Sequence, residues 1–362
     1  MANLITIGPD VESQPLNDNF AALNDDIVNV PHALYRNAII NGNFDVWQRG
    51  TSFENVPSGT YTADRWVYLH DGTGQQHTIS RQSFIPGQTD VPNNPSYFVR
   101  VSVTSAASGQ TYNVLHQRIE SVRTFAGKTI TITFWAKADA ARTLAVNFWQ
   151  NFGSGGSSEV GVSGASFNLT TNWQKFSCTV TIPSISGKVI GPGDNLGVQF
   201  FFPTEQTFVV DIAQVQLNAG DVALPFQPRS FAEELALCQR YFEKSYDIDT
   251  APGSMAAANG MEILTCDHAV GVGGNLDLFP HGPLRFKVPK RITPTVRIYN
   301  RSNGELNSVF NDSTGQHVNF ANNVLFTGGQ TQVNLILENL TGLNVINAGD
   351  MVSYHWTADA EL

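Results

Sequence analysis

The sequence predicts a mostly β protein, in which an N-terminal helix precedes a β-jelly-roll sandwich, a connector helix and a second antiparallel β-domain. Apolar and polar residues alternate with period 2 through most of positions 37–228, and again after position 260. Turns rich in Asn, Gly, Ser and Pro separate these segments, and only two segments have a helical period. Alternation between such turns is typical of strands with one buried face.

Length and turn positions suggest four parts along the 362 residues. These are a helical segment over 1–35, a jelly roll over 36–229, a connector helix over 230–246 and a C-terminal β-sandwich domain over 247–362. Charged residues make up 14% of the chain and the formal net charge is −10. Nucleic-acid binding normally needs a basic patch, and the sequence has no Lys/Arg cluster. No apolar run approaches the ~20 residues that span a bilayer, so we expect no membrane insertion.

The three cysteines, Cys178, Cys238 and Cys266, lie far apart and form no C-x-x-C pair. An odd number of cysteines cannot form a complete set of disulfides. Two of them lie in strand-like runs and Cys238 lies on a helical stripe. We therefore expect buried free thiols, which fits folding in a reducing compartment.

The N-terminal segment carries an apolar stripe whose members are spaced 4, 3, 4 and 3 residues apart. They are Leu16, Phe20, Leu23, Ile27 and Val30. This is a heptad seam on a helix about 25 Å long, which is too short to be stable alone in water. The stripe therefore needs a partner. Docking on its own domain and association with other copies or a larger assembly both satisfy that need.

The jelly-roll region contains several clear alternations, for example Ile130, Ile132 and Phe134 with threonines between them. Roughly eight strands fit, which favours a two-sheet jelly roll. Trp47 and Trp66 lie in the opening stretch and are expected in the core. Trp135 and Trp173 flank or occupy strands, and we expect them in the core too.

The connector helix begins at a capping box, in which Ser230 is the N-cap and Glu233 reaches back to it. We expect it to extend to about position 244. Its apolar residues follow a 4, 3, 4 spacing: Phe231, Leu235, Cys238 and Phe242. This stripe either packs on one of the two domains or meets copies of itself near a threefold axis.

No enzyme motif appears in the sequence, and its eight histidines form no metal-ligand pair. A glycosidase needs two carboxylates about 5–10 Å apart. The jelly roll offers six candidates, which the sequence alone does not bring together: Asp45, Asp64, Asp71, Glu120, Glu159 and Asp211. We therefore expect no catalytic activity.

Sugar binding suits this composition better, because sugar rings stack on aromatic side chains and polar side chains bind their hydroxyls. The candidate ligand-binding residues are consecutive: Trp149, Gln150, Asn151 and Phe152. Trp149 ends a strand, on the face opposite Leu144, Val146 and Phe148, and a Gly-rich loop follows. The alternative for Trp149 is packing in the core or between subunits.

Several segments resemble a family of phage tail proteins related to carbohydrate-binding modules. NAIINGNFDVWQRGTSF followed by YTADRW is similar to the opening of that domain. WQNFGSGGSSEV, FNLTTNWQKFSCTVTIP and FVVDIAQVQLNAGDVALPFQPRSFAEELALCQRYFEKSY follow in the family's order. PLNDNFAALNDDI is similar to the N-terminal helix that anchors tail and fibre proteins in the virion. KVPKRITPTVRIY and YHWTADAEL resemble a C-terminal β-domain that often accompanies these modules, so the resemblance covers nearly the whole chain.

The resemblance implies a virion structural protein, assembled in the bacterial cytoplasm, that forms a homotrimer and binds other virion proteins through residues 1–35. It also implies attachment to host-surface polysaccharide or another receptor, with loops at 302–311 and 321–330 as the contacts if the second β-domain reads the receptor. The alternatives are a purely structural tail or head-fibre component and a glycan-degrading tailspike.

Related carbohydrate-binding modules often hold a structural Ca²⁺ between their first and last strands. The resemblance places Asp211 in the closing strand and Asn43 or Asp45 in the opening one, and oxygen ligands of this kind suit Ca²⁺. Ordinary hydrogen-bonded aspartates are the alternative. We expect no other cofactor.

Overall fold

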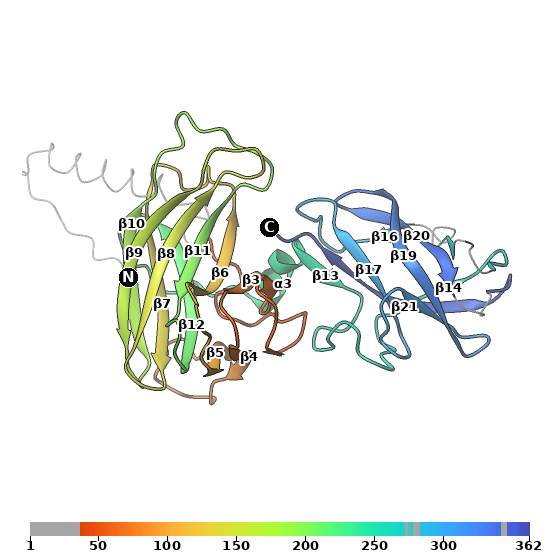
Figure 1. The fold of residues 1–362 in the computed structure, drawn as a ribbon, viewed down its shortest axis with the longest axis horizontal. Coiled ribbons are helices and arrows are strands. Elements are labelled where there is room, and N and C mark those ends of the chain that lie inside the picture. Colours follow the sequence, from red (N-terminus) through yellow and green to blue (C-terminus); the bar gives the residue numbers. More distant parts are fainter. Residues whose placement is uncertain (1–36, 272–273, 275, 278–282, 342–345) are drawn as a thin grey trace, which may run out of the picture.

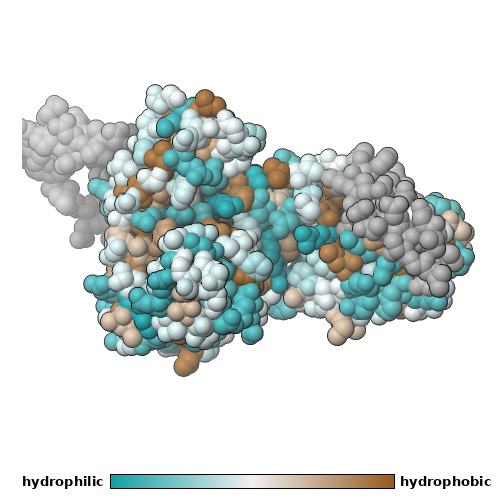
Figure 2. Space-filling view, in the orientation of Figure 1, coloured by the Kyte–Doolittle hydropathy of each residue, from teal (hydrophilic) through white to brown (hydrophobic). Residues whose placement is uncertain are grey.

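The computed structural model describes residues 37–271, 274, 276–277, 283–341 and 346–362. The predicted heptad residues Leu16, Phe20, Leu23, Ile27 and Val30 lie outside these residues, so the N-terminal anchor stays a prediction. Two β bodies lie side by side, and the end of the chain marked C lies between them (Figure 1). Figure 2 shows polar and apolar residues interspersed over one face of both bodies. In the described part of the chain, no helix has the length and apolarity to cross a membrane.

The first body is an antiparallel sandwich of two six-stranded sheets, which confirms the predicted jelly-roll class. The first sheet has the strand order β1-β4-β5-β12-β7-β10 and the second has β2-β3-β6-β11-β8-β9. The twelve strands are β1 Ser52–Glu54, β2 Thr60–Tyr61, β3 Trp66–His70, β4 Gln76–Ser83, β5 Tyr97–Ser105, β6 Asn113–Glu120, β7 Thr129–Ala138, β8 Arg142–Asn151, β9 Val160–Leu169, β10 Gln174–Thr181, β11 Asn195–Phe201 and β12 Phe208–Ala219.

The core of the sandwich lies between the two sheets, as the alternation predicts. Ile130, Ile132 and Phe134 of β7 are fully buried and face the second sheet. Burying a side chain of this kind contributes about 1.5–3 kcal/mol. Trp66 is also fully buried, and its ring lies 5.2 Å from Phe44 and 6.0 Å from Phe200 between centroids. The tryptophans of the opening stretch are therefore core residues.

The opening stretch runs beside the second half of β12. Val215 N donates to Gly42 O and Ala38 N donates to Leu217 O, with N–O distances of 2.8 and 2.9 Å. A Cβ at position 42 would lie 2.0 Å from Val215 O, so only glycine fits this close approach. The opening stretch and the last strand, β12, of the jelly roll are thus neighbours.

Two of the four tryptophans predicted for the core are only half-buried. Trp135 is on the outer side of β7, in register with Lys175 of β10. Trp173 packs against Phe84 and Phe98, with ring centroids 5.3 and 5.2 Å away. The prediction was wrong for Trp135 because odd-numbered positions of β7 face away from the other sheet. Trp173 lies just before β10 rather than within the sheet.

The connector helix α3 spans Phe231–Gln239 and starts with the predicted capping box. It is shorter than predicted, because Phe242–Lys244 form strand β13, which pairs with Thr357–Asp359. The second β-domain therefore starts near Phe242. The predicted stripe is also wrong at Phe231, which is 48% exposed, whereas Glu234 and Cys238 form the buried face.

Over the residues that the structure describes, the second β-domain is one antiparallel sheet of nine strands, so the predicted two-sheet sandwich is wrong here. The other eight strands are β14 Glu262–Thr265, β15 Leu276–Asp277, β16 Leu284–Arg285, β17 Thr295–Asn300, β18 Ser308–Asn311, β19 Gln316–Gly328, β20 Gln332–Thr341 and β21 Met351–Asp359. Strand β21 joins the parts of this sheet, because it pairs with four other strands: β13, β14, β17 and β18. The predicted contact loops 302–311 and 321–330 belong partly to strands, because residues 308–311 form β18 and residues 321–328 lie in β19. Only residues 302–307 and 329–330 of these two segments lie outside the strands β18 and β19.

All three thiols are buried and free, as predicted. Cys238 is 0% exposed, Cys266 is 3% exposed and Cys178 is 8% exposed. Burial raises the pKa of each, that of Cys266 to about 11.

Candidate functional site

A hollow of about 310 Å³ lies on the outer face of the second sheet of the jelly roll. Strands β3, β6, β11 and β8 form its floor, and Tyr112 and Glu159 lie just beyond strand ends. Its apolar lining is aromatic and aliphatic, and its polar lining contains amides, one imidazole, one guanidinium and one carboxylate. The lining residues are Leu69, Tyr112, Val114, His116, Arg118, Trp149, Asn151, Glu159, Asn195, Gln199 and Phe201.

Alternation along β8 decides which of the four predicted sugar-binding residues reach this hollow. Trp149 is 37% exposed and lines the hollow together with Asn151. Gln150 and Phe152 are both 0% exposed, because they point to the opposite side of the strand. Gln150 Nε2 donates to Pro183 O at 3.0 Å. The prediction is therefore wrong for Gln150 and Phe152, and the core alternative is excluded for Trp149.

Trp149 stands between two glycines of the neighbouring strands. It is in register with Gly197 of β11 on one side and Gly161 of β9 on the other. Arg118 of β6 is in register with Gly197 on its far side. Adjacent strands are about 4.8 Å apart, so Arg118 and Trp149 lie roughly 10 Å apart across a glycine. The missing side chain leaves the hollow between the guanidinium and the indole.

The space above Gly197 is partly filled by the imidazole of His116. A Cβ on Gly197 would lie 2.4 Å from His116 Nε2. His116 is 6% exposed, and neither ring nitrogen has a hydrogen-bond partner among the described residues. Burial, together with the nearby charges of Arg118 and Arg65, lowers the pKa of His116 to about 3. The ring is therefore neutral at ordinary pH and forms an uncharged wall.

The other polar groups of the hollow are held in place by local bonds. Asn151 Nδ2 donates to Glu159 Oε1 at 2.7 Å, and Asn151 Oδ1 accepts from Gly153 N at 2.8 Å. Asn195 is in register with Asn151, and its amide donates to Gly193 O at 3.0 Å. These bonds fix an acceptor-rich edge beside Trp149. Such a surface presents hydrogen-bonding groups around one aromatic ring without a strong net charge.

Five of the six carboxylates considered for catalysis have structural roles. Each of the five accepts hydrogen bonds from neighbouring residues. Asp64 accepts from Gln48, and Asp45 accepts from Asn43. Asp71 accepts from Thr111 and Tyr112, Glu120 accepts from Arg240 and Tyr241, and Asp211 accepts from Arg100. Only Glu159 lines the hollow, where it is bonded to Asn151. Among the residues that the structure describes, the lining of the hollow thus contains a single carboxylate.

The two aspartates proposed for Ca²⁺ do not fit such a site. Both oxygens of Asp211 accept from Arg100, at 2.7 and 2.9 Å, and Lys137 Nζ lies 3.8 Å away. Asp45 accepts from Asn43 Nδ2 at 2.9 Å, and burial raises the pKa of its carboxyl. No group of three or more His, Cys, Asp or Glu that could hold a metal occurs in the described parts of the chain.

Sequence reasoning found Trp149 and Asn151 but missed the part of the hollow contributed by β6 and β11. Arg118 and Gln199 lie 31 and 50 positions from Trp149 along the chain. Alternation indicates that both face outward, but the strand order β6-β11-β8 is what brings them beside Trp149.

No protein-family model matches the chain, and no curated protein matches it. Solved structures match about half of it. A carbohydrate-binding module, CBM4, is 18% identical with a TM-score of 0.32, over 50% of this chain and 98% of that chain. The module TmCBM61, solved with β-1,4-galactotriose, is 13% identical with a TM-score of 0.30, over 51% of this chain and 99% of that chain. The enzymatically active domain of tailspike protein 4 of bacteriophage CBA120 is 17% identical with a TM-score of 0.34, over 52% of this chain but 22% of that chain.

Proposed function

We propose that the jelly roll binds glycan chains in the hollow around Trp149, and that the chain belongs to a phage tail or fibre that attaches to host-surface polysaccharide. The observation that supports glycan binding is the half-exposed indole of Trp149 between Gly161 and Gly197. A sugar ring stacks on such an indole, and the neighbouring amides and the Arg118 guanidinium bind its hydroxyls.

The site is shallow and weakly charged, so each contact with a sugar is modest. A trimer carries three such sites, and several fibres on one particle multiply them further. Linking weak sites raises the overall avidity without any new contact. This mode of binding suits a particle that first scans a surface reversibly.

The binding site is tested with a printed array of bacterial surface polysaccharides and oligosaccharides, followed by calorimetry on the tightest binder. We expect Trp149→Ala to weaken binding at least about tenfold, a loss of ~1.4 kcal/mol. Trp173→Ala is the matched control, because Trp173 is a half-buried tryptophan just before β10 of the opposite sheet. Equal affinities of the two variants would rule out the hollow as the site. Release of reducing sugar in the same mixtures would instead indicate a glycan-degrading tailspike.

The phage assignment is supported by the ordered family resemblance over residues 37–66, 149–183 and 208–246. Residues 1–35 are the proposed virion anchor. We expect deletion of this segment to leave a soluble trimer, measured by sedimentation, while particles assembled with it lack the protein. Incorporation of the truncated chain into particles would overturn the anchor.

A further inference from the structure

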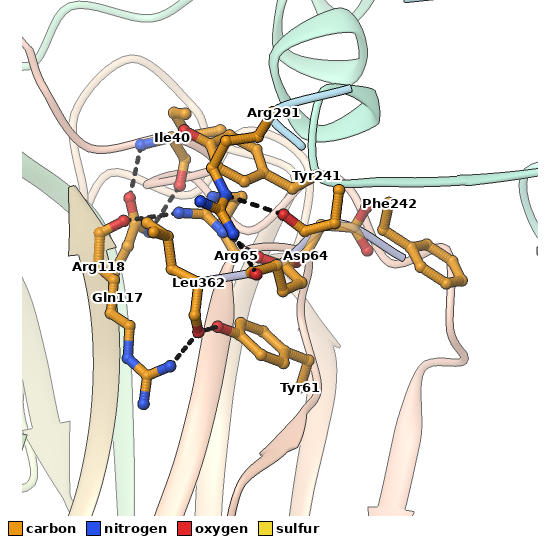
Figure 3. Close-up of polar contacts among 12 residues, drawn as sticks. Ile40, Tyr61, Asp64, Arg65, Gln117, Arg118, Tyr241, Phe242, Arg291 and Leu362 are labelled. Carbon is orange, nitrogen blue, oxygen red and sulfur yellow. Dashed lines mark hydrogen bonds and ion pairs between the residues drawn. The ribbon is translucent and has the colours of Figure 1, made fainter. Parts of the chain in front are cut away.

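We infer that the second β-domain controls the glycan affinity of the jelly roll, because residues Glu361 and Leu362 hold Arg118 in place at the edge of the hollow. Figure 3 shows the side chains that meet there. This inference rests on the proposed function and adds a regulatory contact to the same site. We assign Arg118 to direct contact with the glycan, whereas Glu361 is a positioning residue that acts through Arg65.

Arg118 belongs to the lining of the hollow and also contacts the second β-domain. Arg118 lines the hollow, and its Nη1 donates to an oxygen of Leu362. Tyr61 Oη donates to the same Leu362 oxygen at 2.9 Å (Figure 3). One residue of the second domain thus connects β2 and β6 of the jelly roll.

The main chain of Arg118 is held by a second route through Arg65. Arg65 Nη2 donates to Arg118 O at 2.6 Å, while Arg65 Nη1 forms an ion pair with Glu361. The guanidinium of Arg65 also lies 3.3 Å above the ring centroid of Tyr241. The Arg65 and Glu361 side chains are 1% and 5% exposed, so water hardly screens the pair. Leu362 therefore contacts the side chain of Arg118 directly, and Glu361 reaches its backbone through Arg65.

Residues 359–362 take their own position from the second β-domain. Asp359 is the last residue of β21 and is in register with Phe242 of β13. Ala360 N donates to Tyr241 O at 2.7 Å. Arg291 donates to Ala360 O at 2.9 Å and to Glu361 O at 2.7 Å. When the second domain is docked, these bonds deliver Glu361 and Leu362 to the jelly roll.

Glycan binding and domain docking therefore share one residue and are thermodynamically linked. A docked second domain restricts the Arg118 guanidinium, which lowers the entropy lost when a sugar hydroxyl binds it. By reciprocity, a sugar bound to Arg118 must strengthen the contacts of residues 359–362 by the same factor. A fibre whose second domain is pulled or displaced would then release its glycan more readily.

The test uses the full chain, with the array oligosaccharide that the wild-type protein binds most tightly as the probe. We expect Glu361→Ala to weaken binding about fivefold or more, the usual lower limit of such coupling. Asp249→Ala is the matched control: Asp249 lies 3.9 Å from Arg81 of the jelly roll and is 78% exposed. It should bind like the wild type. Tyr61→Phe removes only one donor to Leu362, so it gives a milder loss in a chain that keeps the buried ion pair.

Hydrogen exchange provides a readout that a merely structural role would not change. The probe should slow exchange of the amides of residues 360–362 in the wild-type chain, but not in Arg118→Met. The inference is overturned if Glu361→Ala and Tyr61→Phe bind like the wild type while Trp149→Ala loses binding, in which case the glycan site itself stands. It is also overturned if the probe leaves exchange at 360–362 unchanged. Failure of the wild-type chain to bind any array glycan overturns both proposals.

Discussion

Arg65 of the jelly roll and Glu361 of the second β-domain form an ion pair enclosed at the boundary between the two bodies. Arg65 also covers the ring of Tyr241, and Glu361 Oε1 lies 3.4 Å from Arg49 Nη2. The two β bodies are therefore joined by buried charges as well as by the covalent connector. The attraction of Glu361 raises the pKa of Arg65 despite burial, which lowers it, so the guanidinium stays charged.

Removing one partner of this pair should destabilise the protein strongly. We expect Arg65→Met to lower the free energy of unfolding by about 3 kcal/mol, since it leaves the Glu361 carboxylate buried. This loss is at the low end of the range usual for breaking a buried ion pair, because Arg49 still lies beside the Glu361 carboxylate. Urea unfolding measures it. Arg142→Met is the control: the Arg142–Asp139 pair is partly exposed and should cost less than about 1 kcal/mol. Equal losses would contradict a special role of the boundary pair.

The two glycines beside Trp149 should respond differently to the same substitution. We expect Gly197→Ala to lower the free energy of unfolding by about 1–3 kcal/mol, because the new Cβ collides with the buried His116 ring. Gly161→Ala should have little effect, since no atom lies within 4 Å of the Cβ built there. Thermal unfolding of both variants measures the difference. A tolerated Gly197→Ala would mean that the His116 ring moves freely.

Asp64 should make stability depend on pH in the mildly acidic range. Burial raises the pKa of its carboxyl to about 6, and the charge of Arg49 and bonds from Gln48 offset this only in part. The folded state therefore binds the proton more tightly than the unfolded state, whose pKa is near the ordinary 3.8. The protonated carboxyl of Asp64 therefore contributes to the free energy of unfolding. This contribution is fully present below about pH 4 and is lost as pH rises through about 6.

The isosteric variant Asp64→Asn isolates this contribution. We expect the stability of the wild type relative to Asp64→Asn to fall by up to about 3 kcal/mol between pH 4 and pH 7. Urea unfolding at several pH values measures the difference. A difference that stays constant across this range would show that Asp64 has an ordinary pKa in the folded protein.

The buried thiols should be inert in the native protein. Burial of Cys178, Cys238 and Cys266 raises their pKa values, and the thiolate is the reactive form. We expect Ellman's reagent to label none of the three under native conditions, and all three after denaturation in guanidinium chloride. Rapid native labelling of one thiol would show local opening around it.

Much of the architecture follows from the sequence alone, because it depends on local periodicity. The alternation in β7 and β8 identifies strands and their buried faces, and it predicts that Trp149 faces away from the core. The capping box at Ser230 and Glu233 likewise predicts where α3 begins. These features depend on neighbours within a few residues. The sequence therefore determined the β class, the alternation of faces and the start of the connector helix.

The tertiary structure decided the remaining features, because they depend on partners distant in sequence. An apolar Phe242 fits either a helical stripe or a strand, and pairing with Asp359 makes it a strand. The hollow exists because β6, β11 and β8 hydrogen-bond side by side, which places Arg118 and Trp149 on the two sides of Gly197. The contact of Glu361 with Arg65 joins residues 296 positions apart. No local pattern encodes such distances, since they are set by the order in which whole strands and domains pack together.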